Sequence, residues 1–161
     1  MAIRSFHVSD PEGLDQVAEY VSAFLKSGMC VALRGSLGCG KTEWTRRFLR
    51  LKGVSRPVVS PTFTYYEAYS SEREPVTYYH FDLYRISAED EFFMIGGEEI
   101  MDGDGNICII EWPDVISGLL ENSRTIRIDF EMSGESREVT VSIPDAVMSS
   151  ACDALSDAPV V

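Results

Sequence analysis

The sequence predicts an α/β domain of three layers, in which a mixed, mainly parallel sheet carries helices on both faces and ends in an antiparallel hairpin. Two short, continuously apolar runs, Met29–Leu33 and Ile107–Ile110, are typical of strands buried on both faces. A glycine-rich turn and an amphipathic segment follow the first run, which is the pattern of a strand leading into a helix. Near the C-terminus apolar and polar residues alternate, as in antiparallel strands with one exposed face.

In the first half of the chain, the capping-box pattern at Ser9 predicts the start of a helix. Its apolar residues recur at helical spacing until Gly28, which supplies a stop. After the first buried strand and the glycine-rich turn, Thr42–Leu51 is expected to form a second amphipathic helix. Pro57 and Pro61 then exclude helix from the segment that they bracket.

In the second half, Phe63–Tyr69 and Val76–Phe81 are rich in aromatic and β-branched residues and are predicted to be strands. A second capping-box pattern at Ser87 predicts a short helix. The alternating segment from 126 to 143 turns at Gly134 and predicts the hairpin. The length of 161 residues fits one domain, which we place at residues 1–143. Residues 144–161, rich in Ala, Ser and Asp, are expected to be a weak helix or disordered.

Composition limits the classes of partner. The 26 acidic side chains outnumber 14 basic ones, and a net charge of −12 argues against direct, non-specific binding to DNA or RNA. No apolar run approaches the ~18 residues that a membrane span needs, and residues 1–13 lack the apolar core of a signal peptide. The four cysteines are too scattered for a zinc site or a disulfide scaffold. We therefore expect a cytoplasmic protein without a membrane partner.

One segment matches the phosphate-binding pattern GxxxxGK(S/T). In such loops glycines let backbone N–H groups surround a phosphate, and the following helix directs its positive dipole end at the anion. The lysine would reach the β- and γ-phosphates of ATP or ADP, and the hydroxyl would bind Mg²⁺. The alternative is a glycine-rich turn without a ligand. The residues predicted to bind nucleotide in this segment are Gly35, Ser36, Leu37, Gly38, Cys39, Gly40, Lys41 and Thr42.

Two carboxylates follow apolar strands, where ligands bind in open α/β sheets. Asp82 follows Val76–Phe81, and Glu111 follows Ile107–Ile110. Nucleotide hydrolysis needs such groups to hold the metal and align the nucleophile. Each carboxylate would equally fit a helix cap or a structural ion pair. Thr62, in the turn Ser-Pro-Thr, is a further candidate because switch loops of phosphate-loop proteins place hydroxyls near Mg²⁺ and the γ-phosphate.

The segments GSLGCGKT, SPTFTYYEAY, HFDLYR and IIEWP occur in this order and together resemble the bacterial TsaE (YjeE) family of small P-loop ATPases. The resemblance runs from about Val8 to Ile143 and implies a P-loop NTPase-like fold. It also implies an ATPase that acts on the TsaD–TsaB pair in making N6-threonylcarbamoyladenosine at position 37 of tRNA. The ATPase would not itself transfer the threonylcarbamoyl group, so tRNA would be an indirect partner.

By the same resemblance, Lys41 and Thr42 bind phosphate and Mg²⁺, Glu111 is the Mg²⁺-associated carboxylate, Asp82 supports metal binding or catalysis, and Thr62 lies in a switch-like segment. Four further residues would surround the site, although each also fits a structural role: His80, Tyr84, Arg85 and Trp112.

Two departures from the family pattern stand out. Many relatives carry Thr near Leu14, close to the nucleotide, so this chain is expected to contact the base or ribose differently. Cys39 stands where Ala is common. Two other functions stay open, a small-molecule kinase and a non-hydrolysing, nucleotide-gated binding module. A kinase usually needs an arginine-bearing lid, yet Arg85 is the sole basic residue between Tyr84 and Trp112.

Overall fold

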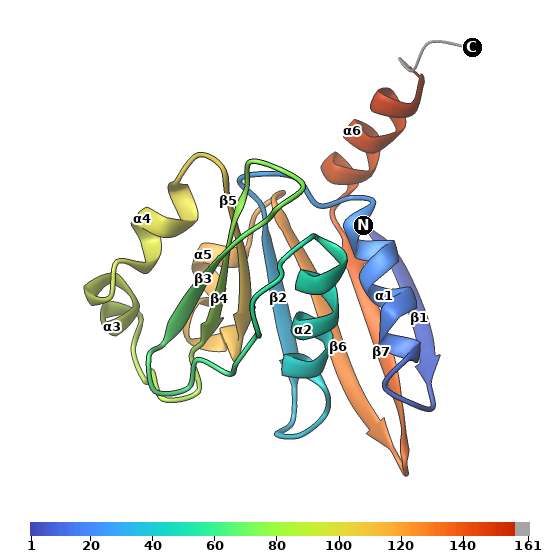
Figure 1. Ribbon diagram of the computed structural model, residues 1–161, viewed down its shortest axis with the longest axis horizontal. Helices are drawn as coiled ribbons and strands as arrows, with labels where there is room; N and C mark the ends of the chain where they lie inside the picture. The colour runs from blue at the N-terminus through green and yellow to red at the C-terminus, as the bar shows by residue number, and fades with distance from the viewer. Residues whose placement is uncertain (157–161) are drawn as a thin grey trace.

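A single seven-stranded sheet forms the centre of the protein (Figure 1). The computed structural model describes residues 1–156, with side chains up to residue 151. The strand order is β1-β7-β6-β2-β5-β4-β3; the four central strands β6, β2, β5 and β4 run parallel, and the outer pairings are antiparallel. The predicted mixed α/β sheet is therefore confirmed. The strands are β1 (Ala2–Val8), β2 (Cys30–Gly35), β3 (Tyr66–Ser70), β4 (Thr77–Asp82), β5 (Asn106–Glu111), β6 (Thr125–Ser133) and β7 (Ser136–Ile143).

Helices cover both faces of the sheet, which gives the three layers. Strand β2 shows why: Val31 and Leu33 pack into one core, whereas Cys30 and Ala32 pack into the other. A strand whose side chains are buried on both faces has a continuously apolar sequence. The first core lies under α1 (Gly13–Ser22) and α2 (Lys41–Leu51), and the second under α3 (Glu89–Met94), α4 (Gly97–Asp102), a 3-10 turn (Pro113–Ile116) and α5 (Ser117–Leu120).

The register of the parallel strands brings the chemical groups to one edge of the sheet. Glu111, the last residue of β5, is paired with Leu33 of β2 on one side and with Asp82 of β4 on the other. Strand β2 extends two residues beyond this row, to Gly35, and its loop follows directly. Ligands in open α/β sheets bind outside the carboxyl ends of the strands, and this edge is such a place.

The N-terminal segment differs from expectation, because Ala2–Val8 forms β1 and pairs along its length with β7. Most of its side chains are exposed, and its polar residues Arg4, Ser5 and His7 do not alternate regularly with the apolar ones, so the pattern gives no strand signal. An edge strand needs little buried apolar surface. The predicted cap at Ser9 is wrong. Helix α1 begins at Gly13, whose N–H donates to Oδ1 of Asp10 at 3.0 Å, so the acidic side chain serves the helix start.

Several short elements were not anticipated: α4, the 3-10 turn and α5, each too short to show a helical period. At α3 the hydroxyl of Ser87 donates to Glu91 Oε1 at 2.7 Å, one position later than the capping-box spacing. The tail forms α6 (Asp145–Ser156), which projects from the domain (Figure 1), and the last part of the predicted tail lies outside the described residues. No helix within residues 1–156 is both long and apolar enough to cross a membrane.

Candidate nucleotide site

The loop between β2 and α2 has the backbone form that its glycines permit. Gly38 and Gly40 have φ values of +78° and +112°, a region that residues with a Cβ rarely adopt. A Cβ at Gly40 would also overlap the guanidinium of Arg137. Helix α2 begins immediately afterwards, at Lys41. The first N–H groups of this helix and those of the loop therefore face the same region, the arrangement that binds phosphate in proteins.

Lys41 is almost fully buried, with 4% of its surface exposed. Its Nζ donates to the carbonyl oxygens of Gly35 at 2.7 Å and Ser36 at 3.0 Å. The ammonium also lies 4.1 Å from the centre of the Trp112 ring, within cation–π distance. Among the described side chains no carboxylate pairs with Lys41. The ammonium is thus held by two carbonyl oxygens and the Trp112 ring, and no described carboxylate neutralises its charge.

Glu111 connects the end of β5 to the first turn of α2. The Thr42 hydroxyl donates to Oε1 of Glu111 at 2.9 Å and reaches Oε2 at 3.1 Å. On its other side Oε1 lies 2.7 Å from Nε2 of His80, whose ring is fully buried. Because a carboxylate only accepts hydrogen bonds, Nε2 must carry the proton in this contact. Two elements far apart in the chain therefore orient one buried carboxylate.

Asp82 holds the switch-like segment. Its Oδ2 accepts hydrogen bonds from Thr62 Oγ1 at 2.9 Å and from Ser60 Oγ at 3.4 Å, and its Oδ1 accepts one from the N–H of Tyr84 at 3.0 Å. Asp82 thus joins this hydroxyl-bearing turn to the end of β4, a contact that the sequence pattern did not predict. Asp82 itself is 5% exposed.

These groups meet in one open cleft of about 310 Å³. Of the predicted site residues, the lining includes Leu37, Gly38, Gly40, Lys41, Thr42, Thr62, Asp82, Glu111 and Trp112. Cys39 is not among them, because its side chain is fully buried in the core below the loop. Its Sγ lies 3.7 Å from Nζ of Lys41; an alanine would pack inward in the same way but without this contact.

The remaining flanking residues lie around the cleft rather than in it. The Tyr84 ring packs against Trp112, with ring centres 4.9 Å apart. The Arg85 guanidinium lies 5.3 Å from the centre of the exposed Phe63 ring. Leu14 is fully buried on α1 and contributes to the first core. Leu14 is therefore a packing position in this chain.

Oxygen donors make the cleft suitable for Mg²⁺. Thr42, Glu111 and Asp82 supply a hydroxyl and two carboxylates, the hard ligands that this ion prefers. In the part of the chain that the structure describes, no group of three or more His, Cys, Asp or Glu side chains is placed to hold a metal alone. Protein Mg²⁺ sites commonly take one or two carboxylates and complete their coordination with substrate phosphates and water. The donors present therefore fit Mg²⁺ bound together with a nucleotide.

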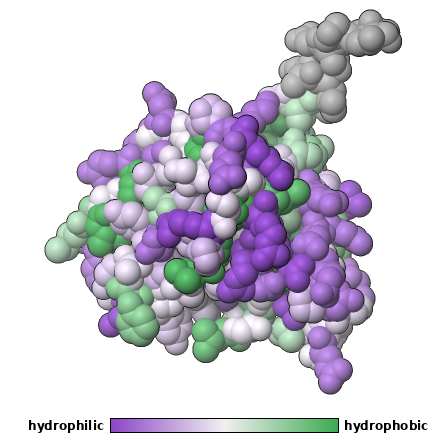
Figure 2. Space-filling view, in the orientation of Figure 1, coloured by the Kyte–Doolittle hydropathy of each residue, from purple (hydrophilic) through white to green (hydrophobic). Residues whose placement is uncertain are grey.

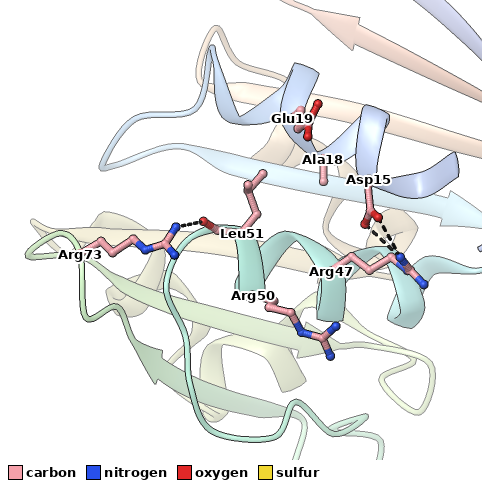
Figure 3. Close-up of a pocket in the computed structure, with 7 residues that line it drawn as sticks. All are labelled: Asp15, Ala18, Glu19, Arg47, Arg50, Leu51 and Arg73. Carbon is pink, nitrogen blue, oxygen red and sulfur yellow. Dashed lines mark hydrogen bonds and ion pairs between the residues drawn. The ribbon is translucent and has the colours of Figure 1, made fainter. Parts of the chain in front are cut away.

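A second cleft, of about 320 Å³, lies between α1 and α2 (Figure 3). Figure 2 shows hydrophilic side chains gathered over this face of the molecule. Arg47 donates to both carboxylate oxygens of Asp15 at 3.0 Å, and Arg73 donates to the Leu51 carbonyl at 3.0 Å. Burial lowers the pKa of Arg47, but its bonds to Asp15 and Glu43 outweigh this and raise it. These contacts join α1, α2 and the segment around Arg73. None of the predicted site residues lines this second cleft.

The family model for the threonylcarbamoyl adenosine biosynthesis protein TsaE matches residues 8–139. This chain belongs to the TsaE family. The match contains the phosphate loop, Asp82 and Glu111, and it confirms the resemblance stated from the motifs. The family takes part in threonylcarbamoyladenosine biosynthesis on tRNA.

Individual TsaE proteins agree with this assignment. The chain is 36% identical to tRNA threonylcarbamoyladenosine biosynthesis protein TsaE of Bacillus subtilis, over 81% of this chain and 80% of that protein. It is 31% identical to the protein of the same name from Rickettsia felis, over 94% and 86% of the two chains. The crystal structure of Bacillus subtilis YdiB superposes with a TM-score of 0.70 at 29% identity, covering 96% of this chain and 95% of that one. This neighbour confirms the fold.

Arg137 is a residue at this site that sequence reasoning missed. It donates from Nη1 to the Cys39 carbonyl at 2.9 Å, although 98 positions separate the two residues. In the sequence it is one polar residue of an alternating strand, where a polar residue normally indicates the solvent face. No local pattern distinguishes it.

Proposed function

We propose that this TsaE-family protein is a Mg²⁺-dependent ATPase that supports the TsaD–TsaB complex in modifying adenosine 37 of tRNA. The observation that carries the proposal is the meeting of Lys41, Thr42 and Glu111 in one cleft, with Thr42 and Glu111 in direct hydrogen-bond contact. A glycine-rich turn without a ligand gives no reason for a buried, unpaired lysine beside a buried carboxylate, since isolated buried charges are costly. A polyanion with its metal ion accounts for both.

In this proposal some residues of the cleft bind the nucleotide and its metal ion, and others position those residues. The backbone N–H groups of the loop and of the first turn of α2 would surround the β-phosphate, and Lys41 would turn from the loop carbonyls toward the β- and γ-phosphates. Thr42 and Glu111 would hold the metal ion, Glu111 in an orientation that His80 maintains. When bound, Mg²⁺ neutralises charge that develops on the phosphoryl oxygens. Asp82 keeps Thr62 and Ser60 at the edge of the same cleft.

Among the described residues that line the cleft, Lys41 is the only cation, and this bears on the partner. An arginine finger contributes about 10³–10⁵ in rate to phosphoryl transfer. Arg85 is the other cation of the motif segments, and its guanidinium lies against the Phe63 ring. The isolated protein should therefore bind nucleotide but hydrolyse it slowly. Because the net charge is −12, a protein surface with basic residues is a better activator than tRNA, which would take part only through the complex.

Phosphate release from ATP tests the proposal. We expect slow release by the protein alone, stimulation of about tenfold or more by TsaD–TsaB, and none by tRNA alone. The stimulation should weaken with added salt if charge steers association. Transfer of phosphate to a metabolite would favour the kinase, and ATP binding without release under any condition would favour the nucleotide-gated module. Full turnover without partners would contradict the dependence on TsaD–TsaB.

A further inference from the structure

We propose that Arg137 is a positioning residue of the phosphate loop: by holding the Cys39 carbonyl it turns the Gly40 N–H toward the nucleotide phosphates. The inference deepens the proposed function and rests on nucleotide binding at this loop. It assigns a role in the site to the C-terminal hairpin, which supplies none of the groups predicted to touch nucleotide or metal.

The guanidinium of Arg137 contacts the phosphate loop from the start of β7. Arg137 lies near the start of β7, paired with Val8 of β1 and Met132 of β6, so its backbone belongs to the interior of the sheet. Its Nη1 lies where a Cβ of residue 40 would project. Gly40 lines the nucleotide cleft, whereas Arg137 does not. Arg137 therefore contacts the loop at Gly40 without lining the cleft.

The contact of Arg137 with the Cys39 carbonyl fixes the direction of the Gly40 N–H, because both belong to one peptide group. The peptide bond between Cys39 and Gly40 is planar and trans, so its C=O and N–H point in opposite directions. Arg137 holds the oxygen at 2.9 Å, so the N–H of Gly40 points away from Arg137. Because Gly40 lines the cleft and Arg137 does not, we infer that this N–H faces the cleft, where a phosphate would accept its hydrogen bond. Without this anchor, the peptide would be free to rotate, because the glycine tolerates many backbone conformations.

The absence of a counter-ion for Arg137 among the described residues also supports a role in nucleotide binding. Within the described residues it forms no ion pair with a carboxylate, and its buried Nε has no hydrogen-bond partner. Burying part of a guanidinium without a counter-ion is unfavourable, so packing alone does not explain this half-buried side chain. Together with Lys41 it supplies a local positive potential in a chain of net charge −12. A bound polyphosphate would compensate both cations.

Calorimetric titration of the full chain with Mg²⁺ and ADP tests the inference. We expect Arg137→Met to weaken ADP binding about tenfold, because one charge-assisted anchor is lost. Arg137→Lys keeps the charge and one donor and should recover most of the affinity. Arg127→Met is the matched control: Arg127 donates to the Leu120 carbonyl at 3.3 Å from the same hairpin, but away from the loop. It should bind ADP as the parent does.

A second readout separates positioning from a purely structural role. The amide signal of Gly40 in a nitrogen–proton NMR spectrum should shift on ADP addition in the parent, and this shift should shrink in Arg137→Met at saturating ADP. A structural role would instead lower the melting temperature and leave the affinity of the folded protein and the Gly40 shift unchanged. ADP affinity equal to the parent in Arg137→Met, or an equal loss in Arg127→Met, would overturn the inference. Failure of the parent itself to bind ADP would instead refute the proposed function.

Discussion

The hydroxyl of Thr42 donates to the carboxylate of Glu111 at 2.9 Å, although 69 residues separate the two along the chain. The bond joins the first turn of α2 to the end of β5. The two groups proposed to hold the metal ion are therefore within contact distance of each other before any ligand binds. Such preorganisation lowers the cost of assembling a site when the nucleotide arrives.

Replacing Glu111 by Gln should separate binding from turnover. The amide keeps the shape of the side chain and an oxygen for Thr42, but it removes the charge that would hold Mg²⁺. We expect near-parental affinity for an ATP analogue and a loss of about a hundredfold in phosphate release. Asp114→Asn, which alters an exposed carboxylate three positions later, should leave release unchanged. Parental turnover in Glu111→Gln would contradict the assignment.

Lys41→Ala should weaken nucleotide binding itself. The substitution removes a buried, unpaired cation from the loop, and hydrogen bonds to charged groups are worth roughly ten- to a hundredfold in affinity. Calorimetry with Mg²⁺ and ADP measures the change. Lys26→Ala removes an exposed lysine far from the loop and serves as the control. Equal affinities in the two variants would exclude Lys41 from phosphate binding.

Cys39→Ala should have little effect on turnover, because the thiol is fully buried below the loop and does not line the cleft. We expect phosphate release within a few-fold of the parent and a slightly lower melting temperature, from the small cavity left behind. Cys30→Ala removes the same atom from the second core and controls for the loss of packing. A large loss of activity confined to Cys39→Ala would indicate that the thiol contacts nucleotide or metal.

Tyr78 should make the protein sensitive to alkaline pH. Burial raises the pKa of its hydroxyl, and the hydrogen bond to Glu74 raises it further. Above about pH 10 the unfolded chain releases this proton while the folded protein keeps it, so the free energy of unfolding falls as pH rises. Chemical denaturation across this range should show a flatter decline in Tyr78→Phe than in the parent. Tyr84→Phe, which removes an exposed hydroxyl, should keep the parental slope.

Strong local patterns made much of the fold predictable. The buried strands predicted at Met29–Leu33 and Ile107–Ile110 appear as Cys30–Gly35 and Asn106–Glu111, shifted by one or two residues at their ends. The long apolar period of α1 was equally visible, although its start was not. Strand β1 was not predicted because its apolar and polar residues follow no regular period, and the residues of β7 that pair with it lie 129 to 141 positions away.

The sequence by itself determined which chemical groups this protein has: a phosphate-loop lysine and threonine, and carboxylates at the ends of strands. Their spacing is local, so the pattern is visible in a short stretch of chain. The tertiary structure alone decided that Thr42 contacts Glu111, that His80 contacts the same carboxylate, and that Arg137 donates to the Cys39 carbonyl of the loop. These contacts join segments separated by 31 to 98 residues. Such contacts depend on sheet order and register, which arise from the packing of the whole chain rather than from any one segment.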